Sequence, residues 1–361
     1  MGMRLIRRFA FLALGGLLTT AQLAAQDPRV GLLTGDVVAS ENRAGLAHSM
    51  VTLEPAGRQT FSTDEGSFTF RGVQPGTYQL RVAHLGFKPR EQTVTVPPSG
   101  LLPRFAVQLE RIQAKLTVVK VLAYPPCLAP GAPDPVTDPD FATIFDQLRQ
   151  NAEAYRLLAD SFPFAYHMNR VLKSARVDGT TTLDGVETLA RFSNAEKSSG
   201  YRAGKVFYES RGSGHIEIPT VRDFGSEEFV KNHCFHHGGL DSTQGGVTLR
   251  IDFEAADRIR EPDVHGAIFL DTATYQIRVA KLSLSKIPSS SRNIASVDAE
   301  TIFREIMPSI FVPAEINSFQ VAKPDPKRKP QPRDPENYTE EQNMLDFVWL
   351  KTDPRKAVQK P

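Results

Sequence analysis

Apolar and polar side chains alternate along residues 63–87. Strict alternation over several positions is typical of a strand that buries one face and exposes the other. The pattern therefore predicts two neighbouring strands whose apolar sides share a core. The apolar positions on these two strands are Phe68, Phe70, Tyr78, Leu80 and Val82.

Turn residues bound both predicted strands. Gly66 stands where a short hairpin loop needs a left-handed residue. Pro75 and Gly76 offer the fixed φ and then the positive φ of a type II turn. We therefore expect a compact antiparallel unit in this part of the chain.

A different period begins at Pro139. Asp138 can cap a helix, Pro139 fits its first turn, and Asp140 suits the positive end of the helix dipole. Apolar residues then recur every three or four positions, which predicts one helix of about 20 residues with a single buried stripe. The stripe is Phe141, Ile144, Phe145, Leu148, Ala152 and Tyr155.

Strand patterns dominate again after Pro163. A short helix is predicted at 226–232, a hairpin at 264–284, and a closing short helix and strand at 298–307 and 310–321. Many antiparallel strands and few helices predict a mainly β protein, whose second domain is an α+β unit with a curved antiparallel sheet and a helix across it. The other predicted strands are 166–172, 185–192, 205–209, 215–219 and 247–253.

Two proline-rich segments divide the chain. The first lies around residues 125–139, and the second is the charged stretch 323–335. Neither can form a central strand or helix, so both are predicted to be linkers. Beyond the second, Thr339 and Gln342 fit a helical capping box before an apolar patch at 344–350. That patch needs a partner surface, either the second domain or another protein or membrane.

The amino end resembles a secretory signal peptide. Arg4, Arg7 and Arg8 precede a short apolar run at 9–18, and small residues follow at 23–25. The run is shorter than the roughly 20 residues that cross a bilayer, so cleavage is favoured over a retained anchor. The predicted divisions are a signal peptide at 1–25, a sandwich at 26–112, a linker at 113–138, the α+β domain at 139–322, and a linker with a tail at 323–361.

The motifs in the first domain resemble a known family. The order Thr-Asp-x-Gly-x-Phe from Thr63, Gly-x-x-Pro-Gly-x-Tyr-x-Leu from Gly72, and Leu-Gly-Phe from Leu85 is similar to carboxypeptidase regulatory-like domains. The resemblance covers about residues 30–112. It implies a small prealbumin-like β-sandwich, a fold often grouped with carbohydrate-binding sandwiches, and an extracytoplasmic setting. It implies no catalysis, because the peptidase chemistry belongs to a different domain.

The second domain loosely resembles the half-barrels of periplasmic lipoprotein carriers. The resemblance rests on the segment 266–271, Gly-Ala-Ile-Phe-Leu-Asp, and on a meander around one helix. It implies an envelope-associated protein, either secreted or periplasmic and compatible with attachment to the outer membrane.

Only two cysteines occur, Cys127 and Cys234. In a secreted chain a disulfide between them is the favoured interpretation, and it would close a loop worth on the order of 4 to 5 kcal/mol by chain entropy. The alternative is two separate buried thiols.

The segment 232–239 is the one local cluster of ligand-type side chains. His233, His236 and His237 could in principle bind zinc, but such sites need three or four convergent ligands. The favoured interpretation is a structural loop beside the disulfide, so no metal and no cofactor are predicted.

The sequence displays no catalytic motif. It lacks H-E-x-x-H, a G-x-S-x-G elbow and a phosphate-binding glycine loop. With 43 Lys and Arg against 41 Asp and Glu, it also lacks the charge of a dedicated nucleic-acid binder. Tyr78 and Phe87 are the rings of the sandwich that could stack on a sugar, although Tyr78 shares its face with core residues.

These patterns favour a secreted, non-enzymatic protein that acts in binding or assembly at the cell envelope, with an envelope protein or glycan as its partner. A hydrolase of envelope polymers with dispersed catalytic residues in the second domain is one alternative. A carbohydrate-binding protein that works through the sandwich is the other.

Overall fold

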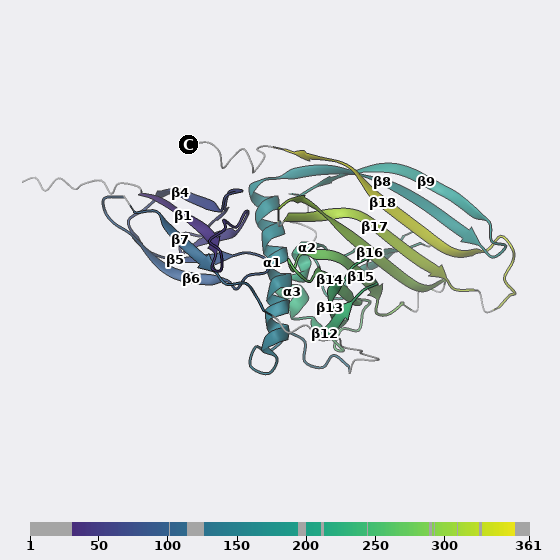
Figure 1. The fold of residues 1–361 in the computed structure, drawn as a ribbon. Helices are drawn as coiled ribbons and strands as arrows, with labels where there is room; N and C mark the ends of the chain where they lie inside the picture. Colours follow the sequence, from purple (N-terminus) through teal and green to yellow (C-terminus); the bar gives the residue numbers. More distant parts are fainter. Residues whose placement is uncertain are drawn as a thin grey trace, which may run out of the picture.

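The computed structural model describes residues 31–100, 102–113, 126–193, 200–210, 213–243, 245–288, 291, 293–308, 310–324 and 327–350. The expected signal peptide and residues 114–125 of the expected linker at 113–138 lie outside these residues. The described part is mainly β, as the sequence predicts. Figure 1 shows a small β-sandwich on one side of helix α1 and a large sheet on the other.

Two sheets form the sandwich. One has the order β4-β1-β7 and the other β3-β2-β5-β6, and all pairs are antiparallel except β1 with β7. Burial alternates along β1, because successive side chains of a strand point to opposite faces. The strands are β1 (Gly31–Ala39), β2 (Met50–Glu54), β3 (Arg58–Phe61), β4 (Ser67–Val73), β5 (Gly76–Ala83), β6 (Arg90–Val96) and β7 (Phe105–Leu109).

The turns of the sandwich agree only in part with the sequence prediction. Gly66 adopts a φ of +87°, the left-handed value expected there. Gly76 instead begins β5 with a φ of +157°, far from the roughly +80° of a type II turn. A left-handed φ of +69° occurs instead at Gly72, within β4. The chain still reverses between Val73 and Gly76, but not through a type II turn with Gly76 as its left-handed residue.

Helix α1 (Pro139–Ser161) begins as the sequence predicts. The Asp138 side chain accepts a hydrogen bond from the Phe141 amide at 3.1 Å, and Pro139 occupies the first turn. The whole predicted stripe is buried, but so are residues on other sides, Gln147, Asn151, Ala154 and Leu157 among them. A helix that is buried on more than one side lies between two bodies, and Figure 1 shows α1 between the sandwich and the large sheet.

The second sheet has nine antiparallel strands in the order β12-β13-β14-β15-β16-β17-β18-β8-β9. Its apolar face packs with α1 in one large core, together with α2 (Val221–Phe224) and α3 (Glu227–Val230). A separate hairpin joins β10 (Phe207–Ser210) and β11 (Ser213–Ile216). The nine strands are β8 (Phe164–Arg176), β9 (Thr181–Phe192), β12 (His233–Asp241), β13 (Thr248–Ala255), β14 (Val264–Asp271), β15 (Ile277–Leu284), β16 (Ile294–Met307), β17 (Ile310–Ala322) and β18 (Pro335–Trp349).

Two helix predictions near the carboxyl end are wrong. Residues 298–307 belong to strand β16, and the capping-box residues Thr339 and Gln342 lie in strand β18. β18 is hydrogen-bonded to β17 on one side and to β8 on the other. The second domain therefore continues to Trp349 instead of ending at 322. Pairing with two distant strands outweighs a local preference that is worth about 1 kcal/mol.

The two domains share one core. Met50, Phe61, Ala83 and Ile112 of the sandwich belong to the same buried cluster as the apolar residues of α1. Gln147 of α1 accepts a hydrogen bond from the Gly86 amide at 2.8 Å. Gly86 belongs to the Leu-Gly-Phe motif that marks the family resemblance, so in this protein the motif also joins the two domains.

Neither α1 nor the shorter described helices meet the length and apolarity that a membrane-crossing helix requires.

Candidate functional site

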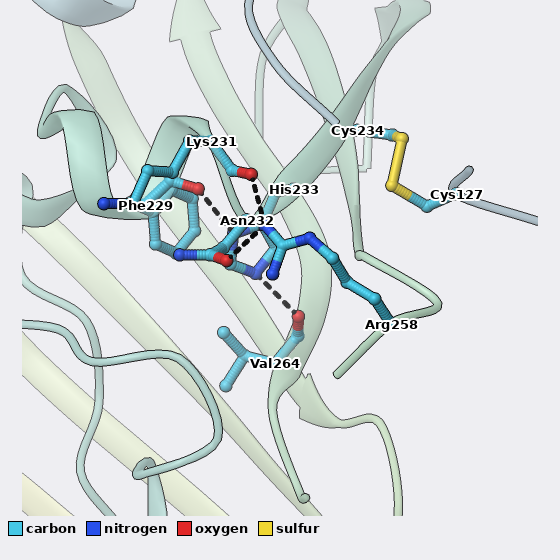
Figure 2. The surroundings of a disulfide bond; sticks show 8 residues. All are labelled: Cys127, Phe229, Lys231, Asn232, His233, Cys234, Arg258 and Val264. Carbon is cyan, nitrogen blue, oxygen red and sulfur yellow. Dashed lines mark hydrogen bonds between the residues drawn. A yellow bond between two sulfur atoms is a disulfide. The ribbon is translucent and has the colours of Figure 1, made fainter. Parts of the chain in front are cut away.

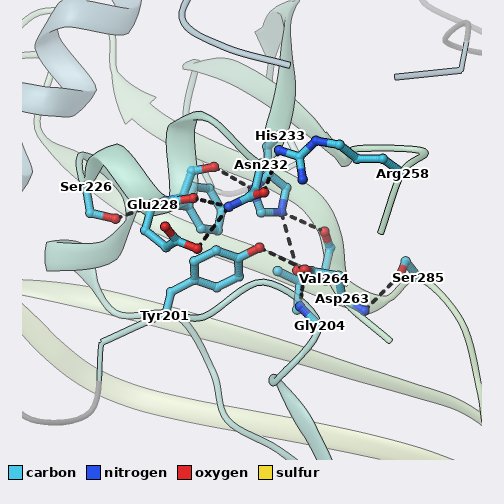
Figure 3. A network of polar contacts seen from close by, with 11 residues as sticks. Tyr201, Gly204, Ser226, Glu228, Asn232, His233, Arg258, Asp263, Val264 and Ser285 are labelled. Carbon is cyan, nitrogen blue, oxygen red and sulfur yellow. Dashed lines mark hydrogen bonds and ion pairs between the residues drawn. The ribbon is translucent and has the colours of Figure 1, made fainter. Parts of the chain in front are cut away.

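His233, the first candidate ligand, is fully buried in a polar network (Figure 3). Its Nδ1 lies 2.8 Å from the Phe229 carbonyl oxygen, and its Nε2 lies 3.1 Å from the Val264 carbonyl oxygen. Nε2 also lies 3.6 Å from a carboxylate oxygen of Asp263. These oxygen atoms only accept hydrogen bonds, so both ring nitrogens face acceptors within the protein. Both nitrogens are thus engaged within the protein and are not directed at a metal.

Asp263 is the carboxylate of this network and lies close to the His233 ring. Burial alone would raise the pKa of Asp263, but hydrogen bonds from His233, the Gly204 and Val264 amides and the Tyr201 hydroxyl outweigh it and lower the pKa. Burial, reinforced by the nearby Asp263 carboxylate, raises the pKa of Tyr201. Every group in this network is engaged within the protein, which indicates a structural role.

The disulfide stands next to this network. Cys127 and Cys234 are joined, and Figure 2 shows the bond beside His233 on β12. The same short segment contacts the sheet through its backbone, because Gly131 donates to the His233 carbonyl at 3.0 Å and Asp257 donates to the Cys127 carbonyl at 3.0 Å. The chain that enters α1 is thus attached to the edge of the large sheet.

The three histidines do not converge. His233 shares a face of β12 with Phe235, whereas His236 lies on the other face, in register with Asp252. His237 packs against the Phe141 ring of α1, with ring centroids 5.7 Å apart. Within the described residues no group of three or more potential metal ligands comes together.

Partial burial has the largest effect on the pKa values of His236 and His237. It lowers the pKa of His236, opposed by the charges of Glu254 and Asp252. It also lowers the pKa of His237, opposed by the charges of Asp138 and Asp140 near the start of α1. Both rings are therefore mainly neutral at neutral pH.

The strongest candidate for binding is the sheet face opposite α1, which we call the open face. It contains an open hollow of about 650 Å³ across β15, β16, β17 and β18. A second hollow of about 280 Å³ adjoins it across β13, β14 and β15, and the two share Lys281 and Ser283. The alternating side chains that line the larger hollow are Lys281, Ser283, Asp298, Glu300, Asn317, Phe319, Thr339 and Glu341.

Two of the acids that line the larger hollow are paired with lysines. Lys281 Nζ lies 3.0 Å from Glu300, and Lys173 Nζ of the neighbouring β8 lies 2.8 Å from Glu341. The Ser283 hydroxyl donates to Asp298 at 2.6 Å. The hollow is consequently polar without a strong net charge, which suits an uncharged or zwitterionic polar ligand.

Apolar groups in the hollows are few. Phe319 is 40% exposed and belongs to the larger hollow. Phe269, in the smaller one, is covered by Arg250 and Lys281, whose cationic groups lie 5.8 Å and 6.0 Å from the ring centroid. Phe319 is thus the exposed aromatic ring with which a ligand in the larger hollow can make contact.

Some carboxyl groups of this sheet have lowered pKa values and favour the charged form. Burial works to raise the pKa of Asp241, Asp271 and Glu340, but hydrogen bonds and nearby arginines outweigh it, and all three pKa values are lowered. A general acid needs a raised pKa to hold a proton at neutral pH. These carboxylates are suited to hydrogen bonding, not to proton donation.

Neither aromatic candidate of the sandwich forms an open sugar platform. Phe87 is 2% exposed, with the Arg111 guanidinium 4.7 Å from its ring centroid. Tyr78 is half-buried, and its hydroxyl donates to the Gln74 carbonyl at 2.9 Å. Both rings contribute to the sandwich core instead.

With the geometry of both domains established, comparison with known proteins identifies the first of them. Residues 33–110 match the family model of the carboxypeptidase regulatory-like domain. This segment is a carboxypeptidase regulatory-like domain. The β-sandwich inferred from the motifs is thereby confirmed. No curated protein matches the chain.

Among solved structures, the chain is similar to a DUF1329 family protein from Desulfovibrio piger, at 10% identity, with 63% of this chain and 100% of that chain covered and a TM-score of 0.31. A putative membrane-associated protein from Bacteroides fragilis is 9% identical, with 88% and 99% covered and a TM-score of 0.18. The major pilin subunit BcpA of Bacillus cereus is 11% identical, with 86% and 95% covered and a TM-score of 0.18. Likenesses this weak say nothing about function.

The sequence did not point to the open face. The residues of its larger hollow come from four strands that span 281–341, and only the sheet register brings them together. Alternation of polar and apolar positions along 277–302 could have indicated a polar face, but not its shape.

Proposed function

We propose that this protein is a secreted, non-enzymatic component of the cell envelope that binds a polar envelope polymer on the open face. The observation that carries the proposal is the asymmetry of the nine-stranded sheet. One face is covered by α1 in a continuous core, while the other keeps adjoining polar hollows of about 650 and 280 Å³. In this proposal the carboxypeptidase regulatory-like domain supports the sheet from the far side of α1.

The chemistry of the hollow supports binding over turnover. Lys281 and Lys173 pair with two of its acids and the Ser283 hydroxyl donates to a third, while the pKa of Glu340, which also lines the hollow, is lowered. Hydroxyl, amide and carboxylate groups around one exposed ring are the groups that hold a sugar chain. A glycan is therefore the ligand class that fits best.

The test is sedimentation of the purified chain with isolated peptidoglycan and, separately, with a neutral polysaccharide. We expect saturable binding to a glycan polymer, and Phe319→Ala should weaken it about five- to tenfold, as expected for the loss of one ring contact. Leu345→Ala is the matched control, because Leu345 is 61% exposed but lies outside both hollows.

Two results would overturn the proposal. Equal binding by the Phe319 and Leu345 variants would place the ligand elsewhere. Release of soluble fragments from the polymer, detected by mass spectrometry and lost in an Asp298→Asn variant, would show a hydrolase instead.

A further inference from the structure

The two edge strands of the nine-stranded sheet differ in how far other parts of the chain cover them. At one edge, β12 is partly covered by the segment around Cys127, through the disulfide and the hydrogen bond from Gly131 to His233. At the other edge, β9 pairs with β8 and with no other described strand. Among the described residues, no backbone hydrogen bond reaches the outer side of β9. A long edge strand with free amides and carbonyls is a template for another strand.

The side chains of β9 do not protect this edge. The strand has twelve residues, and none of them is buried. Leu183, Val186 and Phe192 are 63%, 59% and 44% exposed. Val186 and Phe192 lie on the open face, since they are in register with Val171 and Ala165 of β8. The strand contains no proline and no lysine; its charged side chains are Asp184, Glu187 and Arg191, and its one irregularity is a register shift opposite Leu172 and Lys173 of β8, before the segment from Val186 to Phe192.

The sequence of β9 is complementary to itself in one antiparallel register. A two-fold axis normal to the sheet keeps each face on its own side, so only residues of one face can pair. With Leu189 opposite its own copy, Val186 stands opposite Phe192 and Glu187 stands opposite Arg191. The first pair is apolar and the second has opposite charges, and each occurs twice across the axis.

The two registers centred closer to the amino end of β9 are worse. Centring the pairing on Glu187 would place two carboxylates opposite each other, and centring it on Thr188 would place Phe192 opposite Asp184. The favoured register also agrees with contacts already present. Glu187 is 2.5 Å from Arg170, and Arg191 donates to Gln342 at 3.2 Å, so both side chains are already held on the face that they need.

We propose that two copies of this chain associate through antiparallel pairing of their β9 strands, centred on Leu189. The pairing joins the two nine-stranded sheets into one and buries Val186 and Phe192. It also places the open faces of both copies on the same side, because the axis is normal to the sheet. This dimerisation does not depend on the ligand of the open face.

Site-specific crosslinking tests the register. Val186→Cys and Phe192→Cys variants carry different tags, and both positions are exposed enough for the fold to tolerate the change. Directly opposite residues have Cα atoms about 5 Å apart, within reach of a disulfide. Mild oxidation of the mixed variants should therefore give a disulfide-linked heterodimer on a non-reducing gel. Each variant alone should give none, because two copies of either position are far apart in this register.

Sedimentation equilibrium tests the association itself. We expect the unmodified chain to show a reversible monomer–dimer equilibrium, and Phe192→Lys should raise the dissociation constant roughly tenfold through the two lost apolar pairs. Leu183→Lys is the matched control, because Leu183 is exposed on the same strand but lies outside the paired segment.

A monomer at every concentration would overturn the proposal, as would crosslinks between two copies of Val186→Cys. An equal effect of the Phe192 and Leu183 substitutions would also overturn it. Pairing of β9 only with a strand of a different protein would appear as a monomer in these measurements and count against the dimer.

Discussion

At the residue scale, two glycines of the sandwich allow two costs of substitution to be compared. One is the cost of a left-handed backbone, and the other is the cost of a steric clash with the new Cβ atom. Gly66 and Gly72 both have left-handed φ, +87° and +69°. A Cβ on Gly66 would meet the Val37 carbonyl oxygen at 2.5 Å and the Leu46 amide nitrogen at 2.8 Å, whereas a Cβ on Gly72 would meet nothing within 4 Å.

We therefore expect Gly72→Ala to lower the free energy of unfolding by about 1 kcal/mol, the cost of the left-handed conformation alone. Gly66→Ala should cost at least twice as much, because backbone atoms also have to move. Urea denaturation of both variants measures the difference. Equal losses in the free energy of unfolding would mean that the backbone around Gly66 can shift at little energetic cost.

His84 gives the sandwich a dependence on pH. Burial lowers its pKa to about 4, and the nearby charges of Arg111 and His48 add to the effect. The neutral ring lies 3.1 Å from the Ser49 hydroxyl. Because the pKa in the folded state is below the unfolded value of about 6.5, the unfolded state binds the proton more tightly. Stability from this residue is complete above pH 6.5 and is lost as the pH falls toward 4.

Between pH 7 and pH 5, His84 should thus reduce the free energy of unfolding by about 2 kcal/mol. His84→Gln cannot titrate, so its unfolding free energy should fall less over the same range. The difference between the two pH profiles, measured by chemical denaturation, isolates this residue from the acids of the chain. Parallel profiles would contradict the assignment.

At the scale of elements, α1 and β18 show what local sequence can and cannot specify. Helix α1 carries its own start signal and a stripe of period 3.6, so its position follows from adjacent residues. Strand β18 has mostly half-exposed positions and no clear alternation, and its conformation depends on β17 and β8 on either side. A capping box at Thr339 is a weak local preference that two ladders of backbone hydrogen bonds override.

The same contrast applies to the burial of α1. Its predicted apolar stripe accounts for the contact with one body. Polar groups of α1 contact both bodies: Asn151 donates to the Tyr275 carbonyl and accepts from the Ile277 amide of the large-sheet domain, at 2.9 and 3.0 Å, and Gln147 accepts from the Gly86 amide of the sandwich. Hydrophobic periodicity cannot reveal such contacts, because both residues appear polar and therefore exposed.

At the scale of the whole molecule, α1 makes the two domains one mechanical unit. Phe61 of the sandwich stacks on Phe162, just beyond the helix, with ring centroids 6.5 Å apart. Arg81 pairs with Glu153 of α1 at 3.2 Å, although this partly exposed contact adds little stability. The shared core indicates that the sandwich and the large sheet unfold together.

The single tryptophan, Trp349 in β18, allows a direct test, because its fluorescence reports on the large sheet. Phe68→Ala removes a ring that is 2% exposed within the sandwich core and should cost about 3 to 5 kcal/mol. If unfolding is cooperative, the urea midpoint seen by Trp349 moves to lower concentration. The exposed neighbour Thr69→Ala is the control and should leave it unchanged. If Phe68→Ala leaves the urea midpoint unchanged, the sandwich and the large sheet unfold independently.

The sequence by itself determined the features that depend on neighbours along the chain. These are the alternation of the sandwich strands, the left-handed Gly66, the capped start of α1 and the family motifs of residues 33–110. Each is set by backbone geometry or by side chains within a few positions, where local preferences suffice.

Only the tertiary structure decided the rest. The insertion of β18 between β17 and β8, the separation of His233 from His236 onto opposite faces, and the assembly of the hollow from residues between 281 and 341 all depend on strand register. Register is a choice among pairings of distant segments, and a shift of one residue moves every side chain to the other face. The open face and the free β9 edge therefore exist only once the whole sheet has formed.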